Sequence, residues 1–197
     1  MALPRIVLAS TSRYRRELLE RLRCPFEVQA PQIDETPLPS EAPRETAIRL
    51  ARGKAEDVAA HRSGAIVIGS DQTLDLGGVA LGKPLSHEAA LAQLQSLQGR
   101  TAVFYTAVAV IGPVMSSVQL DCVPTTVTFR NLSTVQLDAY LRSDQPYDCA
   151  GAAKIESLGI TLIKSAESAD PTALIGLPLI RLTSMLASAG IDVLTPR

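Results

Sequence analysis

Residues 66–84 read IVIGSDQTLDLGGVALGKP, and this stretch decides the expected fold and its candidate site. Its opening apolar run predicts a short buried strand. The polar GSDQ segment ends that run, so we expect Asp71 just past the strand, held rigidly with its carboxylate facing a cleft. The GG pair predicts a tight two-residue turn, and the chain then returns Lys83 to the same neighbourhood. A carboxylate and an ammonium placed together in this way suit a metal-bound phosphate.

The same stretch also allows a purely structural interpretation. A buried strand, a capping aspartate and a surface lysine would give the same pattern, and the segment taken alone favours that interpretation. Residues 77–83 fit the first part of a phosphate-binding loop, GxxxxGK, which next requires Ser or Thr and a helix. Pro84 has no hydroxyl and pushes Lys83 toward an extended conformation. The phosphate-loop interpretation is therefore excluded.

Composition narrows the class of protein. The chain has 197 residues, 46% of them hydrophobic and 20% charged, which is typical of one globular domain. A net charge of −1 provides no general attraction to nucleic acid or to a membrane surface. We expect neither partner. Only four residues are lysines against fifteen arginines, so the position of each lysine is informative.

Cysteine and histidine usage predicts a cytoplasmic protein without a disulfide framework or a zinc site. The three cysteines are widely spaced and form no CxxC motif or cluster with histidine. The histidines, His61 and His87, lie in helical patterns and are expected on the surface. No apolar run reaches transmembrane length, and the first residues lack the layout of a signal peptide.

The remaining elements follow from periodicity and from expected helix caps at Ser12, Ser86 and Ser133, the last forming a capping box with Gln136. Expected strands are 5–9, 26–30, 101–111, 118–129 and 159–164, and expected helices are 13–23, 44–61, 86–97, 133–142 and 177–189. Strands and helices alternate in the first half, and a long antiparallel pair follows. This order predicts one α/β domain, residues 1–197, with a mixed sheet.

Three charged positions are unusual for these elements. Arg15 falls in the first turn of a helix, where a cation is unfavourable, so a bound polyphosphate would explain it better than a solvated basic face. Lys54 falls on the apolar stripe of its helix, and it either reaches the protein edge or meets a buried anion. Glu35 belongs to a polar, proline-rich loop, residues 31–43, which is either simply exposed or lies over a cleft.

Five separated motifs together resemble the Maf-like nucleotide pyrophosphatases. They are LASTSRYRRELL (8–19), DET (34–36), RLARGKA (49–55), GSDQ (69–72) and LGKP (81–84). The similarity continues through FYTAVAV (104–110), TFRNLS (128–133) and DPTALIGLPL (170–179). It implies an elongated, two-lobed α/β domain with a twisted sheet and a central nucleotide-binding cleft. It also implies hydrolysis of a nucleoside triphosphate to the monophosphate and pyrophosphate.

The resemblance assigns roles to individual residues of this chain. Asp71 would accept a proton from the attacking water, and Glu35 and Asp71 would hold a divalent cation, Mg²⁺ or Mn²⁺. Carboxylates suit such a hard ion, and cations around it would stabilise the charge that develops on the departing pyrophosphate. The residues implied to bind the phosphate chain are Ser10, Arg15, Lys54 and Lys83.

The residues expected to select the base resemble the 7-methyl-GTP pyrophosphatase branch. They are Tyr14, Gln72 and Glu156, where the branch acting on pyrimidine nucleotides tends to have Arg, Thr and Gln. A carboxylate can accept the guanine N1–H and N2–H donors and offset the positive charge of an N7-methylated ring. The tyrosine could stack on the base or donate through its hydroxyl.

Two departures from the family pattern concern the helix start and the base pocket. Arg13 replaces the usual proline, and the segment 152–157 lacks the aromatic residue and the glycine expected near Ala153 and Ser157. Two other functions stay open, a dTTP/UTP pyrophosphatase and a nucleotide-binding regulator of cell division with incidental hydrolysis. A homodimer is also left open.

Overall fold

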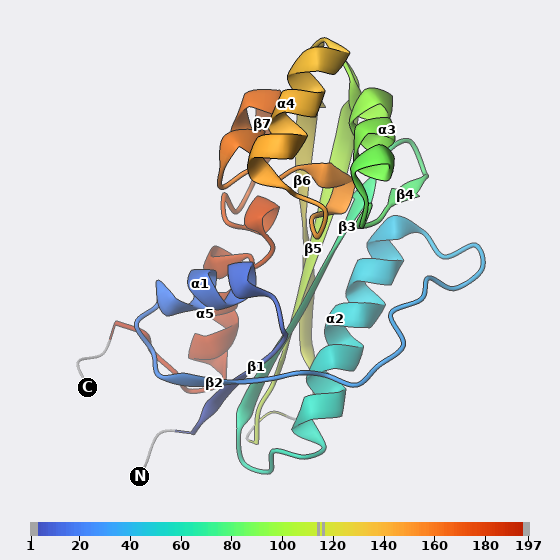
Figure 1. The fold of residues 1–197 in the computed structure, drawn as a ribbon. Coiled ribbons are helices and arrows are strands. Elements are labelled where there is room, and N and C mark those ends of the chain that lie inside the picture. Colours follow the sequence, from blue (N-terminus) through green and yellow to red (C-terminus); the bar gives the residue numbers. More distant parts are fainter. Residues whose placement is uncertain (1–3, 114, 116, 195–197) are drawn as a thin grey trace.

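The computed structural model describes residues 4–113, 115 and 117–194, which form a mixed seven-stranded sheet flanked by helices (Figure 1). The strands are β1 (Ile6–Ala9), β2 (Phe26–Gln29), β3 (Ile66–Asp75), β4 (Ala80–Leu81), β5 (Thr101–Ile111), β6 (Gln119–Phe129) and β7 (Ile163–Ser168). The helices are α1 (Arg13–Glu20), α2 (Pro43–Ala59), α3 (His87–Leu97), α4 (Thr134–Asp144) and α5 (Leu179–Ser188). Short 3₁₀ helices are η1 (Ala150–Ala152), η2 (Leu158–Leu162) and η3 (Ala173–Ile175).

The strand order is β2-β1-β3-β5-β6-β7, with β4 paired to β3. The pairs β1·β2 and β1·β3 are parallel, and the remaining pairs are antiparallel. Parallel strands require helical crossovers, and α1 and α2 provide them. The expected α/β class with a mixed sheet is confirmed.

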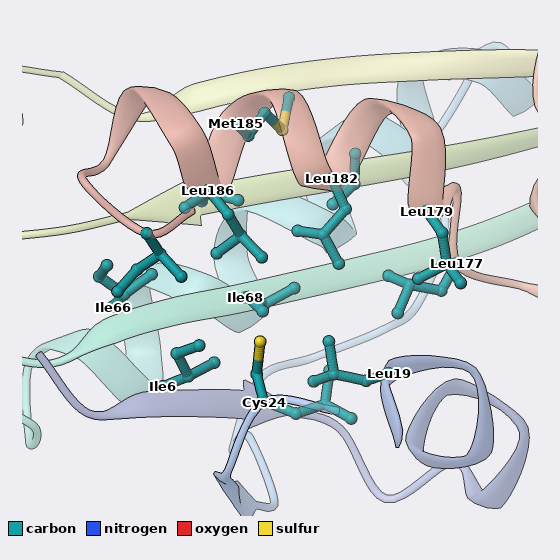
Figure 2. Packing of buried hydrophobic residues seen from close by; sticks show 14 of the residues in the cluster. Ile6, Leu19, Cys24, Ile66, Ile68, Leu177, Leu179, Leu182, Met185 and Leu186 are labelled. Carbon is teal, nitrogen blue, oxygen red and sulfur yellow. The ribbon is translucent and has the colours of Figure 1, made fainter. Parts of the chain in front are cut away.

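Every residue of β1 is buried. Successive strand residues point to opposite sides, so both faces of the sheet are covered here. Figure 2 shows one side, where Ile6, Ile66 and Ile68 pack against leucines of α1 and α5. On the other side Val7 and Val67 pack against the alanine-rich stripe of α2. Continuous apolar runs such as IVLA and IVI are typical of strands covered on both faces.

The contact between α2 and β3 is unusually close. A Cβ on Gly69 would lie 2.2 Å from the Ala51 carbonyl oxygen and 2.7 Å from the Ala55 nitrogen. Only a glycine fits between helix and strand here. The close approach holds α2 directly against the strand that carries Asp71.

A second lobe forms around the far ends of the long strands. Leu74 and Phe104 pack there with residues of α3, α4 and the segments η1 and η2. The strands β3, β5 and β6 run through both lobes, and the molecule is elongated along them (Figure 1). None of the helices within the described ranges has the length and apolar character that crossing a bilayer requires.

Several local predictions are confirmed. Ser12 and Ser86 cap α1 and α3, and Ser133 with Gln136 forms the expected capping box of α4. Gly77 and Gly78 both have positive φ, and Leu76 N–H bonds Val79 O across the turn between β3 and β4.

The extent of β3 was predicted wrongly. The strand does not end at Gly69 but continues to Asp75, because it pairs with β5 along almost its whole length, from Val67↔Ile111 to Asp75↔Val103. Asp71 therefore lies within the strand and not just after it. Polar residues can occupy the middle of a buried strand when their side chains find partners, and those partners form the site described below.

Other boundaries also differ from prediction. The strand expected at 159–164 begins only at Ile163, because the preceding residues form η2. Helix α1 ends at Glu20 and not at residue 23, where Arg23 adopts a left-handed φ of 53°. Helix α5 begins two residues late, at Leu179, after Pro178 in an extended conformation.

His87 is half-buried and bonded to Asp138 and Tyr147, whereas a surface position was expected.

Candidate active site

One cleft of about 680 Å³ lies along an interrupted edge of β3. On this edge β1 pairs with β3 only as far as Gly69, and β4 pairs with it only at Leu74 and Asp75. Residues 70–73 lie between these two pairings. Side chains from both faces of the strand can therefore reach the same space.

The cleft brings together all nine side chains singled out in the sequence. They are Ser10, Tyr14, Arg15, Glu35, Lys54, Asp71, Gln72, Lys83 and Glu156. They come from α1, α2, β3 and four separate connecting segments. Their roles stay predictions, but their proximity is a property of the fold.

Lys54 joins two carboxylates at the centre of this group. Its Nζ lies 2.7 Å from Asp71 Oδ1 and 3.0 Å from Glu35 Oε1. The Lys54 side chain is 5% exposed and that of Asp71 is 10% exposed, whereas that of Glu35 is 53% exposed. The sequence left open whether Lys54 reaches the protein edge or meets a buried anion, and the structure shows the buried anion, Asp71. The stripe of α2 that carries Lys54 also presents Thr46 and Leu50 to the cleft.

Arg15 adds a second cation on the Asp71 carboxylate. Its NH2 atom lies 3.9 Å from Asp71 Oδ1, and its Nε donates to the Gly176 carbonyl oxygen at 3.0 Å. The bond to Gly176 fixes the plane of the guanidinium. Arg15 also lines the cleft, so its remaining N–H groups are donors available to an anion bound there.

The turn between β1 and α1 has the features of an anion site. Ser10 is buried and accepts a hydrogen bond from Ser12 N–H, and the Ser12 hydroxyl accepts one from Arg15 N–H. A strand, a hydroxyl-rich turn and the positive end of a helix then meet at one point. Lys83 lines the same cleft from the exposed loop between β4 and α3.

The loop that carries Glu35 is fastened to α2 by Glu41 and Arg49. Arg49 donates to both carboxylate oxygens of Glu41, at 2.6 and 2.8 Å, and to the Thr36 carbonyl oxygen at 3.1 Å. The Arg49 guanidinium lowers the pKa of Glu41 from 4.5 to about 2. Pro31, Glu35 and Pro37 of this loop line the cleft, so of the two alternatives left open by the sequence the loop lies over the cleft.

The base-selecting candidates occupy other walls of the cleft. The Tyr14 hydroxyl accepts from Arg13 NH2 at 2.8 Å and donates to Asp148 at 3.5 Å. Burial raises the pKa of Tyr14, so its hydroxyl stays neutral. Glu156 is open to solvent at the cleft, but the surrounding walls remove part of its hydration and raise its pKa.

The amide of Gln72 has a defined orientation. Its Nε2 donates to Thr106 Oγ1 at 2.9 Å and to the carbonyl oxygens of Ala173 and Leu174 at 2.9 and 3.2 Å. A reversed amide would set Oε1 against these carbonyl oxygens. The donor end of Gln72 is therefore committed to the protein, and Oε1 is the end left to bind a ligand.

Three features of the cleft were missed in the sequence. Asp148 and Cys149 line it beside Tyr14, and burial raises the pKa of the Cys149 thiol to about 12. The turn 174–176 forms another wall. This turn belongs to the DPTALIGLPL motif, which supported the resemblance but suggested no role. Cys149 opens a segment of small residues, 149–156, whose composition predicts a close approach of the backbone to a ligand, but Asp148 had no sequence signal of its own.

The residues present fit a divalent cation only as a partial ligand set. Glu35 and Asp71 supply two carboxylates around one point, now bridged by Lys54. No group of three or more His, Cys, Asp or Glu suited to a metal occurs among the residues that the structure describes. Mg²⁺ is usually bound by one or two carboxylates together with substrate phosphates and water, so two carboxylates beside a phosphate site are sufficient.

Comparison with known proteins shows the family of this chain. The family model for Maf-like proteins matches residues 5–189. The chain belongs to the Maf-like family. The match includes every cleft residue named above.

Maf-like relatives are similar over nearly their full lengths. A Thiobacillus denitrificans protein named 7-methyl-GTP pyrophosphatase is 59% identical over 192 residues, covering 98% of this chain and 96% of the relative. Proteins of the same name from Cupriavidus metallidurans and Methylobacillus flagellatus are 57% and 53% identical. These matches cover 95% and 98% of this chain, and 94% and 100% of the relatives.

A solved structure of a HAM1 protein from Coxiella burnetii shares the fold of this Maf-like chain. The TM-score is 0.54 at 19% sequence identity, covering 95% of this chain and 100% of the other. At this identity the likeness concerns the fold alone. The two-lobed mixed sheet is thus also the architecture of that protein.

Proposed function

We propose that this Maf-like protein is a nucleoside triphosphate pyrophosphatase that hydrolyses 7-methyl-GTP to 7-methyl-GMP and pyrophosphate. The observation that carries the proposal is the position of Asp71, a nearly buried carboxylate between Lys54 and Arg15 in a cleft large enough for a nucleotide. The names of the relatives, at 53–59% identity, support the same activity. We expect it to act in the cytoplasm.

In the proposed reaction Asp71 accepts a proton from a water molecule that attacks the α-phosphorus. The bond from this phosphorus to the bridging oxygen breaks, and pyrophosphate leaves with the electron pair. A carboxylate positioned within a rigid strand can act as this general base, which contributes about 10²–10⁴ in rate. The short contact with Lys54 fixes its orientation.

The cations of the cleft would bind the phosphate chain and stabilise its developing charge. Arg15 is preorganised by its bond to Gly176, and Lys54 is held in the interior. Preorganised charges of this kind need not reorient as the reaction proceeds. Lys83 and the turn at Ser10 would complete the phosphate site.

We propose Mg²⁺ or Mn²⁺ as the cofactor, held by Glu35 and Asp71. A divalent ion bound there would neutralise negative charge on the phosphate oxygens and lower the repulsion of the attacking water. Glu35 is well suited to exchange partners, because its side chain is half exposed and lies on a loop.

The base would be selected by hydrogen-bond acceptors. Glu156 provides a carboxylate and Gln72 provides Oε1, which complement the N1–H and N2–H donors of guanine. The negative charge of Glu156 also favours the cationic ring of 7-methylguanine. Tyr14 is positioned to stack on the base or to donate to it. A pyrimidine with carbonyl oxygens at this edge would be repelled.

A substrate panel tests this proposal directly. Pyrophosphate release from 7-methyl-GTP, GTP, UTP and dTTP is measured with Mg²⁺ and with Mn²⁺, for the wild type and for Asp71→Asn. We expect 7-methyl-GTP to have the highest kcat/KM, and Asp71→Asn to lower kcat by about 10²–10⁴ while nucleotide binding persists. Preference for UTP or dTTP would indicate the pyrimidine activity instead. Tight binding without turnover would indicate a nucleotide-binding regulator.

A further inference from the structure

The turn formed by residues 173–176 contacts two side chains of the cleft, Arg15 and Gln72. Its Gly176 carbonyl oxygen accepts from Arg15 Nε at 3.0 Å. Its Ala173 and Leu174 carbonyl oxygens accept from Gln72 Nε2. One short turn thus supports both a phosphate-binding candidate and a base-selecting candidate.

Two buried hydroxyls hold this turn from the sheet. Ser70 Oγ shares its one proton between the Ala107 carbonyl oxygen on β5, at 2.8 Å, and the Gly176 carbonyl oxygen, at 3.0 Å, so it links the turn to the sheet. Thr106 Oγ1 donates to the Ala173 oxygen at 2.8 Å. Both residues are fully buried, at 0% exposure, so neither can touch a nucleotide. Thr106 is also the cross-strand partner of Gln72 and accepts from its amide.

The other side of the turn is fixed independently. The buried Asp170 carboxylate accepts from the backbone N–H groups of Thr172, Ile180 and Arg181. Leu177, directly after the turn, is fully buried in the core between β3 and α5 (Figure 2). With its ends anchored, the turn keeps its carbonyl groups oriented through the hydroxyls of Ser70 and Thr106.

We propose that Ser70 and Thr106 are positioning residues with separate tasks: Ser70 sets Arg15 through Gly176, and Thr106 sets the Gln72 amide through Ala173. The inference rests on the proposed pyrophosphatase function. Every nucleoside triphosphate has the same phosphate chain, so loss of the Ser70 hydroxyl affects all substrates equally. The bases differ, so loss of the Thr106 hydroxyl changes the preference among them.

The experiment compares Ser70→Ala and Thr106→Val in the full chain. kcat/KM is measured for 7-methyl-GTP, GTP and UTP, and thermal unfolding is recorded in parallel. Thr101→Val is the matched control, because Thr101 lies on the same strand β5 but its hydroxyl bonds Thr128, outside the cleft. The control should keep wild-type kcat/KM values.

We expect Ser70→Ala to lower kcat/KM for all three nucleotides by one common factor, of about 10 to 100, because small displacements of a binding group have effects of this size. Thr106→Val should lower the ratio of 7-methyl-GTP to UTP turnover by roughly tenfold, and Thr106→Ser should restore it. Ser70→Cys and Thr106→Cys place a weakly donating thiol at each position, so they should show the same two patterns. If Ser70→Ala or Thr106→Val does not fold, the cysteine variant at the same position tests the proposal instead.

Several results would overturn the inference. These are wild-type kinetics in either pair of variants, an equal loss for all substrates in the Thr106 variants, or a changed preference in the Ser70 variants. A loss of thermal stability with unchanged substrate ratios would also mean that Thr106 is merely structural. Failure of the underlying function looks different, because the wild type would then release no pyrophosphate from any of the nucleotides.

Discussion

Replacing Lys54 with methionine should destabilise the protein strongly, even though methionine keeps an unbranched side chain like the apolar stem of lysine. Lys54 Nζ lies 2.7 Å from Asp71 Oδ1, and the two side chains are 5% and 10% exposed. Removing one partner of a buried ion pair costs about 3–5 kcal/mol, because the other charge is left uncompensated. Arg15, at 3.9 Å, still offsets part of that charge. We therefore expect a loss of ~3 kcal/mol.

For a chain of this length a loss of ~3 kcal/mol corresponds to a fall in Tm of roughly 6–12 °C. The assay is thermal unfolding followed by circular dichroism, without nucleotide and with a chelator present. Arg52→Met is the matched control on the same helix, because Arg52 pairs with Glu56 while both side chains are about half exposed. An exposed pair contributes at most about 1 kcal/mol, so the control should shift Tm only slightly.

The double variant Lys54→Met/Asp71→Asn tests the physical cause. Its Tm should recover much of the loss, because the uncompensated carboxylate is gone. A wild-type Tm in Lys54→Met would refute the reasoning. So would a double variant whose destabilisation equals the sum of the two single effects.

Three further predictions concern pH and packing. Because Arg49 lowers the pKa of Glu41 from 4.5 to about 2, this pair stabilises the fold above pH 4.5 and loses its effect as the pH falls toward 2. The difference in urea midpoint between wild type and Glu41→Gln should thus shrink on acidification, and a pH-independent difference would contradict this. Burial raises the pKa of Glu156, so the preference for 7-methyl-GTP over UTP should increase as the pH rises from the acidic range and Glu156 ionises. Kinetic pH profiles should show this rise in the wild type and a flat ratio in Glu156→Gln. Gly69→Ala should unfold the protein or prevent its soluble expression, whereas Gly82→Ala, where a Cβ meets nothing within 4 Å, should keep the wild-type Tm; comparable stability of the two would exclude the close contact with α2.

Much of the fold follows from local sequence signals. The helix caps at Ser12, Ser86 and Ser133 and the turn at Gly77–Gly78 depend on neighbouring residues only, and all were predicted. The end of β3 was not predictable in this way. Its polar residues 70–73 look like the end of a strand, but pairing with β5 and partners more than 30 residues away along the chain keep them in the sheet.

The candidate site also has parts that local sequence predicts and parts that it does not. Arg15, Lys54 and Asp71 could be found because each is a charge in an unexpected place, and family resemblance joined them. The turn 173–176 carries no charge and acts through backbone carbonyl groups, which any sequence possesses. Its contribution depends on where the chain returns after β7, and no local pattern encodes that position.

The alternation of side chains along β3 has one further consequence. Asp71 points to the face covered by α2, while Ser70 and Gln72 point to the face covered by the 173–176 turn. Shifting the register of β3 against β5 by a single position would exchange these faces and remove the proton acceptor and the base contact together. Insertions or deletions of one residue in this strand should therefore be far less tolerated than substitutions, and a deep mutational scan of residues 66–75 would reveal this difference.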